Sequence, residues 1–230
     1  MNPIEWTQTR LGESLSWDGL IALIKIAQEQ LGVAADGKPG AQTMLALRRH
    51  LGDQYGSKRL PVPRTRKQAA DLYGNPSWVK LPRGRAVDLD DRWESKNIKW
   101  FKLHTGKRVR LHRLVGSEFV RVFREACEES GYTPRSVQTY VPRIIGGSNP
   151  PRLSYHAYGV AVDFDPSNNP WHGKQKSGEW SLLRQHPEFV RVFERNGWVW
   201  GGRWKDGFGD DMHFQRAGKA AGAGEPIKGE

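Results

Sequence analysis

SYHAYGVAVD, residues 154–163, is the stretch that decides how we interpret this sequence. Its second half is mostly apolar, which predicts a β-strand over residues 160–164. His156 would then lie on the loop that enters this strand, and Asp163 would lie on the strand itself. Gly159 and Ala161 are small, and we expect them to leave space beside His156 and Asp163.

A second histidine follows Asp163 by 50 residues, in a stretch that reads DDMHF. Two histidines and a carboxylate suit a catalytic zinc ion, which takes three protein ligands and leaves a fourth position open. His156, Asp163 and His213 are therefore candidate zinc ligands. Asp210 is the candidate general base, and the adjacent Asp211 stays open for that role. Residue types and spacing alone are equally compatible with two ordinary structural histidines.

The region from residue 70 to 218 reads as one α+β domain. Strand-like runs are expected near 99–103, 108–111, 136–141, 160–164 and 198–200. An amphipathic helix is expected over 117–130, ending at Gly131. Cys127 lies on the apolar stripe of that helix, so we expect a buried hydrophobic side chain and no nucleophile. The run EFVRVF at 118–123 recurs at 188–193, which indicates a second similar helix.

The N-terminal residues 1–52 read as a small bundle of two or three helices. One helix is expected over 18–31, with Asp18 as its cap and Gly32 as its stop. A glycine-rich turn over 35–40 leads to a second helix over 41–51. Residues 53–69 are polar, basic and rich in proline, which predicts a linker. Residues 219–230 are predicted to be a flexible tail.

The chain has 230 residues and a formal net charge of +11. Residues 61–115 hold 14 basic and 5 acidic side chains, which accounts for most of the excess. Such a block is either a solvated face or a contact surface for a polyanion such as nucleic acid, lipopolysaccharide or an anionic wall polymer. The apolar content excludes a disordered chain, and a single cysteine excludes an intramolecular disulfide.

The start of the chain lacks the basic and apolar regions of a signal peptide, and no stretch is long and apolar enough for a membrane span. We therefore expect synthesis in the cytoplasm.

Together the two motifs resemble a known family. The patterns SxHxxGxAxD at 154–163 and DxxH at 210–213 are similar to the signature of the VanY/VanX-type zinc peptidases. This group includes D-Ala-D-Ala carboxypeptidases and L-alanyl-D-glutamate endolysins. The run GWVWGGRW at 197–204 also resembles a stretch that precedes the last histidine in the family. The resemblance covers about residues 70–216 and implies an α+β zinc peptidase domain with a small antiparallel sheet and flanking helices.

Carried over by position, the resemblance implies that His156, Asp163 and His213 bind Zn2+ and that Asp210 is the catalytic base. Many members have glutamate where this chain has Asp210, so the base is one methylene shorter here. Arg143, in the run YVPRIIGGS, matches an arginine that binds the substrate's carbonyl or carboxylate, a role that suits a permanently charged guanidinium. Four aromatic side chains close to the motifs are candidate substrate contacts: Tyr155, Tyr158, Trp200 and Trp204.

The N-terminal region has a resemblance of its own. Its pattern DGxxGxxTxxAL, beginning at Asp36, resembles a three-helix peptidoglycan-binding domain over about residues 14–52. Both resemblances imply a monomeric zinc peptidase that binds and cleaves bacterial peptidoglycan, as a phage endolysin does after release from the cytoplasm. They leave open whether an L-alanyl-D-glutamate bond or a bond to D-alanine is cut. Alternatives are a cellular D-alanyl-D-alanine carboxypeptidase, a non-catalytic wall-binding protein with a retained zinc site and, more weakly, a nucleic-acid-binding protein. No specific nucleic-acid reader is recognisable.

Overall fold

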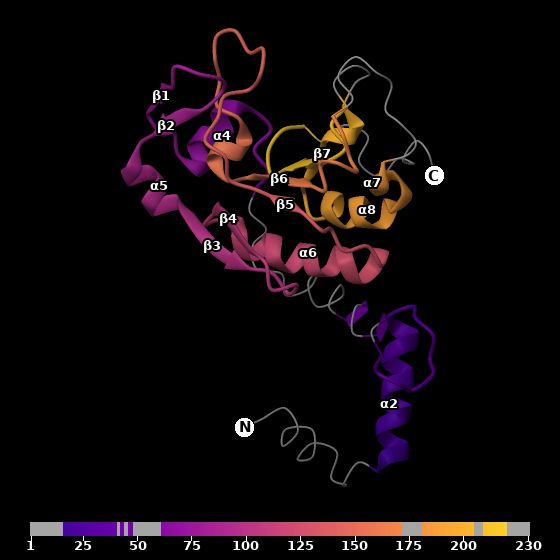
Figure 1. Ribbon diagram of the computed structural model, residues 1–230. Coiled ribbons are helices and arrows are strands. Elements are labelled where there is room, and N and C mark those ends of the chain that lie inside the picture. Colours follow the sequence, from indigo (N-terminus) through magenta and orange to yellow (C-terminus); the bar gives the residue numbers. More distant parts are fainter. Residues whose placement is uncertain are drawn as a thin grey trace. The chain divides into compact units, whose positions relative to one another are not determined.

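A computed structural model describes residues 16–40, 42–43, 46–47, 61–171, 181–204 and 209–219. The chain divides into two compact units, Met1–Arg59 and Leu60–Glu230, and each is described by itself. Figure 1 names their elements along the chain. In the described ranges, no helix has both the length and the apolar character needed to cross a membrane.

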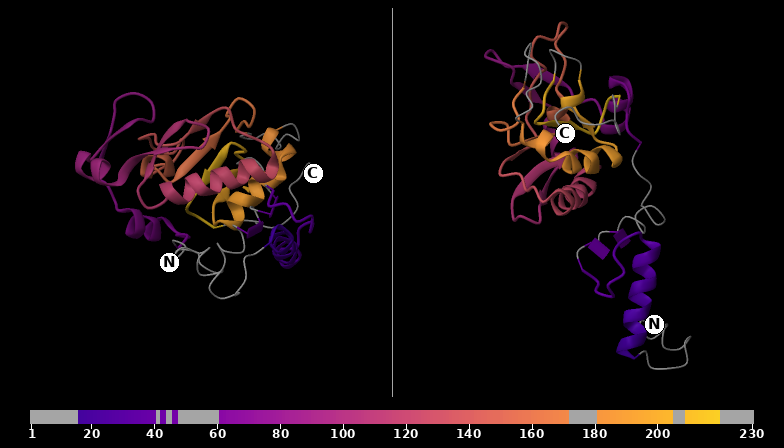
Figure 2. Two further views of the ribbon diagram at one scale, coloured as in Figure 1. Left: turned by 90° about the horizontal axis from the view of Figure 1, so that it is seen from below. Right: turned by 90° about the vertical axis from the view of Figure 1, so that its right-hand side faces the viewer.

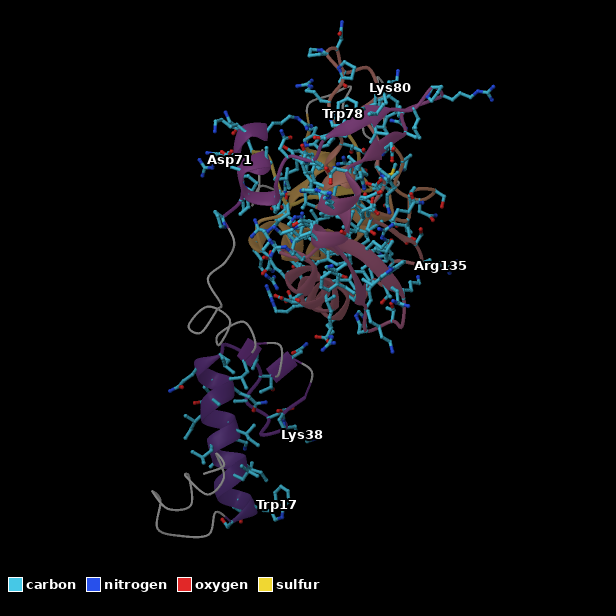
Figure 3. The ribbon with its side chains drawn as sticks, turned by 90° about the vertical axis from the view of Figure 1, so that its left-hand side faces the viewer. Trp17, Lys38, Asp71, Trp78, Lys80 and Arg135 are labelled. Atoms are coloured by element: carbon cyan, nitrogen blue, oxygen red, sulfur yellow. The ribbon has the colours of Figure 1, made fainter. Side chains whose placement is uncertain are left out.

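The first unit is built on helix α2 (Trp17–Gln30), close to the predicted helix 18–31. The cap differs from the prediction, because the Ser16 hydroxyl accepts from the backbone N–H of Gly19 at 3.1 Å while Asp18 lies within the first turn. Gly32 follows at φ +68°, which agrees with its predicted role as a stop. Trp17, at the start of the helix, is 80% exposed and its ring stands clear of the helix in Figure 3.

The DGxxGxxT motif is held together by Gln28, a residue that sequence reasoning did not single out. Its amide nitrogen donates to Asp36 Oδ1 and to Thr43 Oγ1, both at 2.8 Å, and its Oε1 accepts from the backbone N–H of Gly37 at 2.8 Å. Gly37 has φ +74°, and a Cβ there would meet Ile21 Cγ2 at 2.7 Å. The motif is therefore a structural clasp between α2 and the turn that follows.

Much of the predicted helix 41–51 lies outside the described residues, and the four that are described are helical: Gln42, Thr43, Ala46 and Leu47. A three-helix wall-binding domain thus stays a prediction.

The second unit mixes short helices with small antiparallel sheets, which agrees with the predicted α+β class. Its helices are α4 (Arg66–Tyr73), α5 (Asp91–Asn97), α6 (Gly116–Ser130), α7 (Leu182–Gln185) and α8 (Pro187–Arg195), with the 3-10 turns η1 (Tyr155–Tyr158) and η2 (Gly201–Arg203). Its strands are β1 (Trp78–Lys80), β2 (Val87–Leu89), β3 (Ile98–Lys102), β4 (Arg108–His112), β5 (Val137–Gln138), β6 (Ala161–Phe164), β7 (Val199–Trp200) and β8 (His213–Gln215). The predicted strand 136–141 is shorter than expected, since only β5 pairs within it.

The largest sheet has four strands in the order β5-β6-β8-β7, all antiparallel to their neighbours. Helices α6 and α8 lie together against one face of this sheet in Figure 1, and the view from below in Figure 2 shows the same layer. Val162 and Phe164 of β6 and Phe214 of β8 point into the core between the sheet and these helices. The alternate residues Asp163 and His213 therefore belong to the opposite face.

The repeated EFVRVF run forms the contact between α6 and α8. Phe119 of α6 meets Phe193 of α8 with ring centroids 6.0 Å apart, and Phe123 meets Phe189 at 6.5 Å. The first phenylalanine of each copy thus faces the second of the other. Cys127 is buried on the same helix, and burial raises the pKa of its thiol to about 12, so it is inert as predicted.

A second apolar cluster lies beside the other end of the sheet and includes α4. Tyr73 at the end of α4 donates its hydroxyl proton to the carbonyl oxygen of Arg216 at 2.8 Å, and both residues are buried. Residues 66–69, which the sequence predicted as linker, are the first residues of this helix. The predicted linker is therefore too long at its C-terminal end, because α4 begins at Arg66 and its Ala69 and Tyr73 are buried in this cluster.

Candidate metal centre

His156 lies on the 3-10 turn η1, immediately before β6. Ser154 caps the turn by accepting from the backbone N–H of His156, and Gly159 ends it at φ +65°. The structure corrects the role expected for Gly159. A Cβ at this position would lie 2.7 Å from the backbone nitrogen of His112. The missing side chain therefore lets strand β4 pack closely against the turn and does not make space for a metal ion. Ala161 is likewise packed into the core.

Asp163 and His213 face each other across the β6–β8 pair, where they are direct partners in the antiparallel register. Asp163 Oδ1 lies 2.8 Å from His213 Nδ1 and 3.2 Å from His156 Nε2. The two histidine nitrogens are 3.2 Å apart. Three ligand atoms from η1, β6 and β8 therefore meet at one point, as the sequence predicted for His156, Asp163 and His213.

The second nitrogen of each imidazole is already engaged. His156 Nδ1 lies 2.6 Å from the carbonyl oxygen of Thr139, which can only accept, so this nitrogen carries a hydrogen. His213 Nε2 lies 3.0 Å from Oε1 of Gln215. Gln215 donates its amide N–H to the carbonyl of Ala217 at 2.8 Å, which turns its oxygen toward His213. Both histidines are thus oriented with a lone pair toward Asp163.

This donor set fits a metal cation. Neutral imidazoles held in these tautomers present two acceptor nitrogens and a carboxylate oxygen to one another, and a cation satisfies all three. A tetrahedral Zn2+ with ligands at about 2.0–2.1 Å needs ligand atoms about 3.3 Å apart, close to the separations found here. In the metal-free centre, burial acts to raise the pKa of Asp163, but hydrogen bonds from the protonated imidazoles of His156 and His213 hold this pKa well below its usual range, and a bound cation would take the place of those protons. The carboxyl is therefore ionised and available as a ligand.

Asp210 lies beside this centre. Its Oδ1 is buried and has no hydrogen-bond partner among the residues that the structure describes. Burial raises its pKa to about 6, with the charges of Asp163 and Asp211 adding to the effect and those of His213 and Arg143 opposing it. A carboxyl group whose pKa lies near neutrality and whose oxygen is free is suited to accept and return a proton.

Asp211 is excluded from that role by its partner. Arg184 Nε and Nη2 each lie 2.7 Å from one oxygen of the Asp211 carboxylate, and both side chains are buried. The guanidinium also lies over the Trp200 ring at 5.2 Å. This bidentate pair holds the carboxylate as part of the core. Of the two candidates that the sequence left open, Asp210 is the one whose carboxylate is not held in an ion pair, as a general base requires.

Arg143 lies in the loop that pairs with the chain at Ala86 through an isolated β-bridge. Burial lowers the pKa of its guanidinium, whereas the nearby carboxylates of Asp163 and Asp210 oppose that effect. The predicted substrate-binding arginine is therefore close to the metal ligands and the candidate base in the fold, although it lies far from His213 in sequence.

The four aromatic candidates differ in their surroundings. Trp200 is 1% exposed and its indole N–H donates to the carbonyl of Asp211, so it belongs to the core and not to an open groove. Tyr155 and Tyr158 are also buried, in the cluster that contains α4. Trp204 is half-buried, and its ring centroid lies 5.4 Å from that of His213. Trp204 is thus the aromatic candidate that borders the metal centre.

Sequence reasoning missed the residues that support this centre. Gln215 could have been found, because it lies two positions after His213 and so shares its strand face. No sequence pattern marks Arg184 or the Thr139 carbonyl, because only the folded chain brings them next to the candidate ligands and the candidate base. Gly201 packs against the candidate base, because a Cβ there would lie 2.6 Å from the Asp210 carbonyl oxygen.

A comparison with protein families bears on this segment. A family model described as D-alanyl-D-alanine carboxypeptidase, a group of peptidases, matches residues 148–216, which hold the three candidate ligands and Asp210. Neither curated proteins nor solved structures gave a match. The family match confirms the resemblance for this part of the chain, less than half of its length: residues 148–216 are similar to the D-alanyl-D-alanine carboxypeptidases.

Proposed function

We propose that this protein is a zinc-dependent peptidase that hydrolyses an amide bond in the peptides of bacterial peptidoglycan. The observation that carries the proposal is the convergence of His156 Nε2, Asp163 Oδ1 and His213 Nδ1 beside the buried Asp210 Oδ1, which has no hydrogen-bond partner among the described residues. This set lies inside the segment that is similar to D-alanyl-D-alanine carboxypeptidases.

Each residue has a chemical role in this proposal. When bound, Zn2+ would polarise the scissile carbonyl and stabilise negative charge on its oxygen. Asp210 accepts the proton of the attacking water and returns it to the nitrogen of the leaving amine. Arg143 orients the substrate through its carbonyl or carboxylate oxygen. Gln215 and the Thr139 carbonyl keep the imidazoles in the tautomers that bind a cation.

The biological setting belongs to the same proposal. An N-terminal module with the DGxxGxxT clasp would hold the enzyme on the wall, and phage-type release would bring it from the cytoplasm to that substrate. L-alanyl-D-glutamate is then the bond that we favour. A cellular D-alanyl-D-alanine carboxypeptidase is the alternative, because the family match covers the metal centre and does not select the bond.

Binding to anionic envelope polymers would involve the basic segment 61–115. Within it, Arg66 is engaged by the Leu153 carbonyl and Lys67 by Asp71, so neither is the best candidate. Trp100 on β3 is 57% exposed and has the Arg108 guanidinium 4.9 Å from its ring centroid. Replacing Arg108 with glutamate should weaken wall binding at low salt more than at high salt. If the variant bound the wall as tightly as wild type at both salt concentrations, an anionic wall polymer would not be a partner of this segment.

The proposed activity is tested with the full-length protein on purified peptidoglycan. Wild type should release peptides, a chelator should abolish release, and Zn2+ should restore it. His156→Ala should release none and bind no zinc at the site. His104→Ala, which removes an exposed histidine of the same domain, is the matched control and should behave as wild type. Release by His156→Ala at the wild-type rate would refute the proposal.

A further inference from the structure

Among the described residues, the Arg143 guanidinium lacks the carboxylate partner that other largely buried arginines of the domain have. Arg184, Arg203 and Arg216 each reach a carboxylate, at 2.7, 2.5 and 2.9 Å. Arg143 is half-buried, yet within the described ranges no carboxylate forms an ion pair with it. A permanently charged group taken partly out of water requires an anion for compensation. Among the described residues, no carboxylate comes within ion-pair distance of Arg143, although those of Asp163 and Asp210 are near enough to raise its pKa.

A second arginine, the exposed Arg85, lies near it and has no ion pair among the described residues. The backbone brings the two together, because Ala86 and Arg143 form an antiparallel bridge and the Arg85 carbonyl accepts from the N–H of Ile144 at 2.8 Å. The Arg85 side chain runs over Gly146, where a Cβ would lie 3.1 Å from its Nη1. Glycine at 146 therefore leaves room for this side chain.

The pair borders the candidate metal centre, because the Arg143 carbonyl accepts from the backbone N–H of Ser154, two residues before His156, at 2.9 Å. The charge of Arg85 adds to burial in lowering the pKa of Arg143, whereas Asp163 and Asp210 raise it. Arg143 thus interacts electrostatically with Arg85 and with the carboxylates of Asp163 and Asp210. Two adjacent cations repel each other until an anion binds between them, so this place favours a carboxylate on a molecule that occupies the site.

The proposed substrates carry a carboxylate at the matching position. In an L-alanyl-D-glutamate bond and in a D-alanyl-D-alanine bond, the residue that leaves as the amine has its α-carboxylate one carbon from the scissile nitrogen. We propose that Arg85 binds this α-carboxylate together with Arg143 and selects substrates in which it is free. The inference rests on the proposed function and adds Arg85 as its specificity-determining residue.

Matched substrate pairs test this inference. Each pair consists of a stem peptide with a free α-carboxylate on the leaving residue and the same peptide with that group converted to a carboxamide. One pair carries the L-alanyl-D-glutamate bond and the other the D-alanyl-D-alanine bond. For the bond that is cut, wild type should prefer the carboxylate by about tenfold in kcat/KM, the size expected for one charge-assisted contact. In Arg85→Gln this preference should fall toward one, through a higher KM for the carboxylate substrate.

Two variants make the result specific. Arg85→Lys keeps the charge and should retain part of the preference, because a point charge lacks the planar fork. Arg83→Gln removes an exposed arginine two residues away and should keep the full preference. An undiminished preference in Arg85→Gln, or an equal loss on both substrates, would overturn the inference. Absence of cleavage by zinc-loaded wild type would instead refute the proposed function, so the two failures are distinct.

Discussion

Asp163 and His213 lie directly opposite each other on strands β6 and β8, with Oδ1 and Nδ1 2.8 Å apart. This register brings together two residues that are 50 positions apart in the sequence. A shift of one residue along β8 would turn His213 into the aromatic core and Phe214 toward the centre. The packing of Phe214 against α8 therefore fixes the position of a candidate metal ligand.

Gln215 should control the affinity of the centre for zinc. Its side chain holds the hydrogen of His213 on Nε2, so Gln215→Leu releases the ring to adopt the other tautomer. We expect zinc affinity, measured by competition with a chelator, to fall by about 10–100-fold. Gln138→Leu is the control, because Gln138 pairs with Asp163 through the backbone while its side chain is exposed. Equal affinities in the two variants would contradict this role.

Asp210→Asn should lose activity and gain stability. Removing a general base costs about 10²–10⁴-fold in kcat. Because the pKa of Asp210 is raised to about 6, its ionisation destabilises the folded state as pH rises through the interval from its model value of 3.8. In zinc-free protein we expect the variant to be about 1–3 kcal/mol more stable at pH 7 and equally stable below about pH 4. Denaturant titrations at both pH values measure this, and lower stability at pH 7 would contradict it.

Asp211→Asn should have the opposite effect on stability. It leaves the buried Arg184 guanidinium without its carboxylate, which costs about 3–5 kcal/mol. Urea unfolding at pH 7 measures the change, and a double-mutant cycle with Arg184→Met isolates the pair. If Asp211→Asn were as stable as wild type, the ion pair would not hold the segment that carries Asp210.

Gly159→Ala and Gly131→Ala separate close packing from backbone strain. Both glycines have positive φ, +65° and +68°, but an added Cβ meets the His112 backbone only at Gly159. We expect a loss of about 1 kcal/mol at Gly131, from strain alone, and at least twice that at Gly159. Thermal unfolding of the two variants gives the comparison. Equal losses would mean that β4 moves away at little cost.

The sequence predicted the parts of the site that depend on local pattern. The helix 117–130 and the strand near 160–164 follow from periodicity. Residue type and spacing made His156, Asp163 and His213 candidate ligands, and the family resemblance favoured that role over structural histidines. The choice between Asp210 and Asp211 did not follow from the sequence, because Arg184 comes from α7 and its contact has no local signature. Gly159 was misassigned for a similar reason, since its neighbour His112 is 47 residues away in the sequence and only the fold brings β4 against it.

The central claim is tested most directly by mass spectrometry of purified peptidoglycan incubated with the metal-free protein, before and after addition of Zn2+. We predict no new fragments without metal. With Zn2+, peptides should appear with one new amino terminus and one new carboxyl terminus at a single type of stem-peptide bond, or free D-alanine should appear if the enzyme is a carboxypeptidase. An unchanged fragment pattern from protein that has bound one equivalent of Zn2+ would contradict the claim.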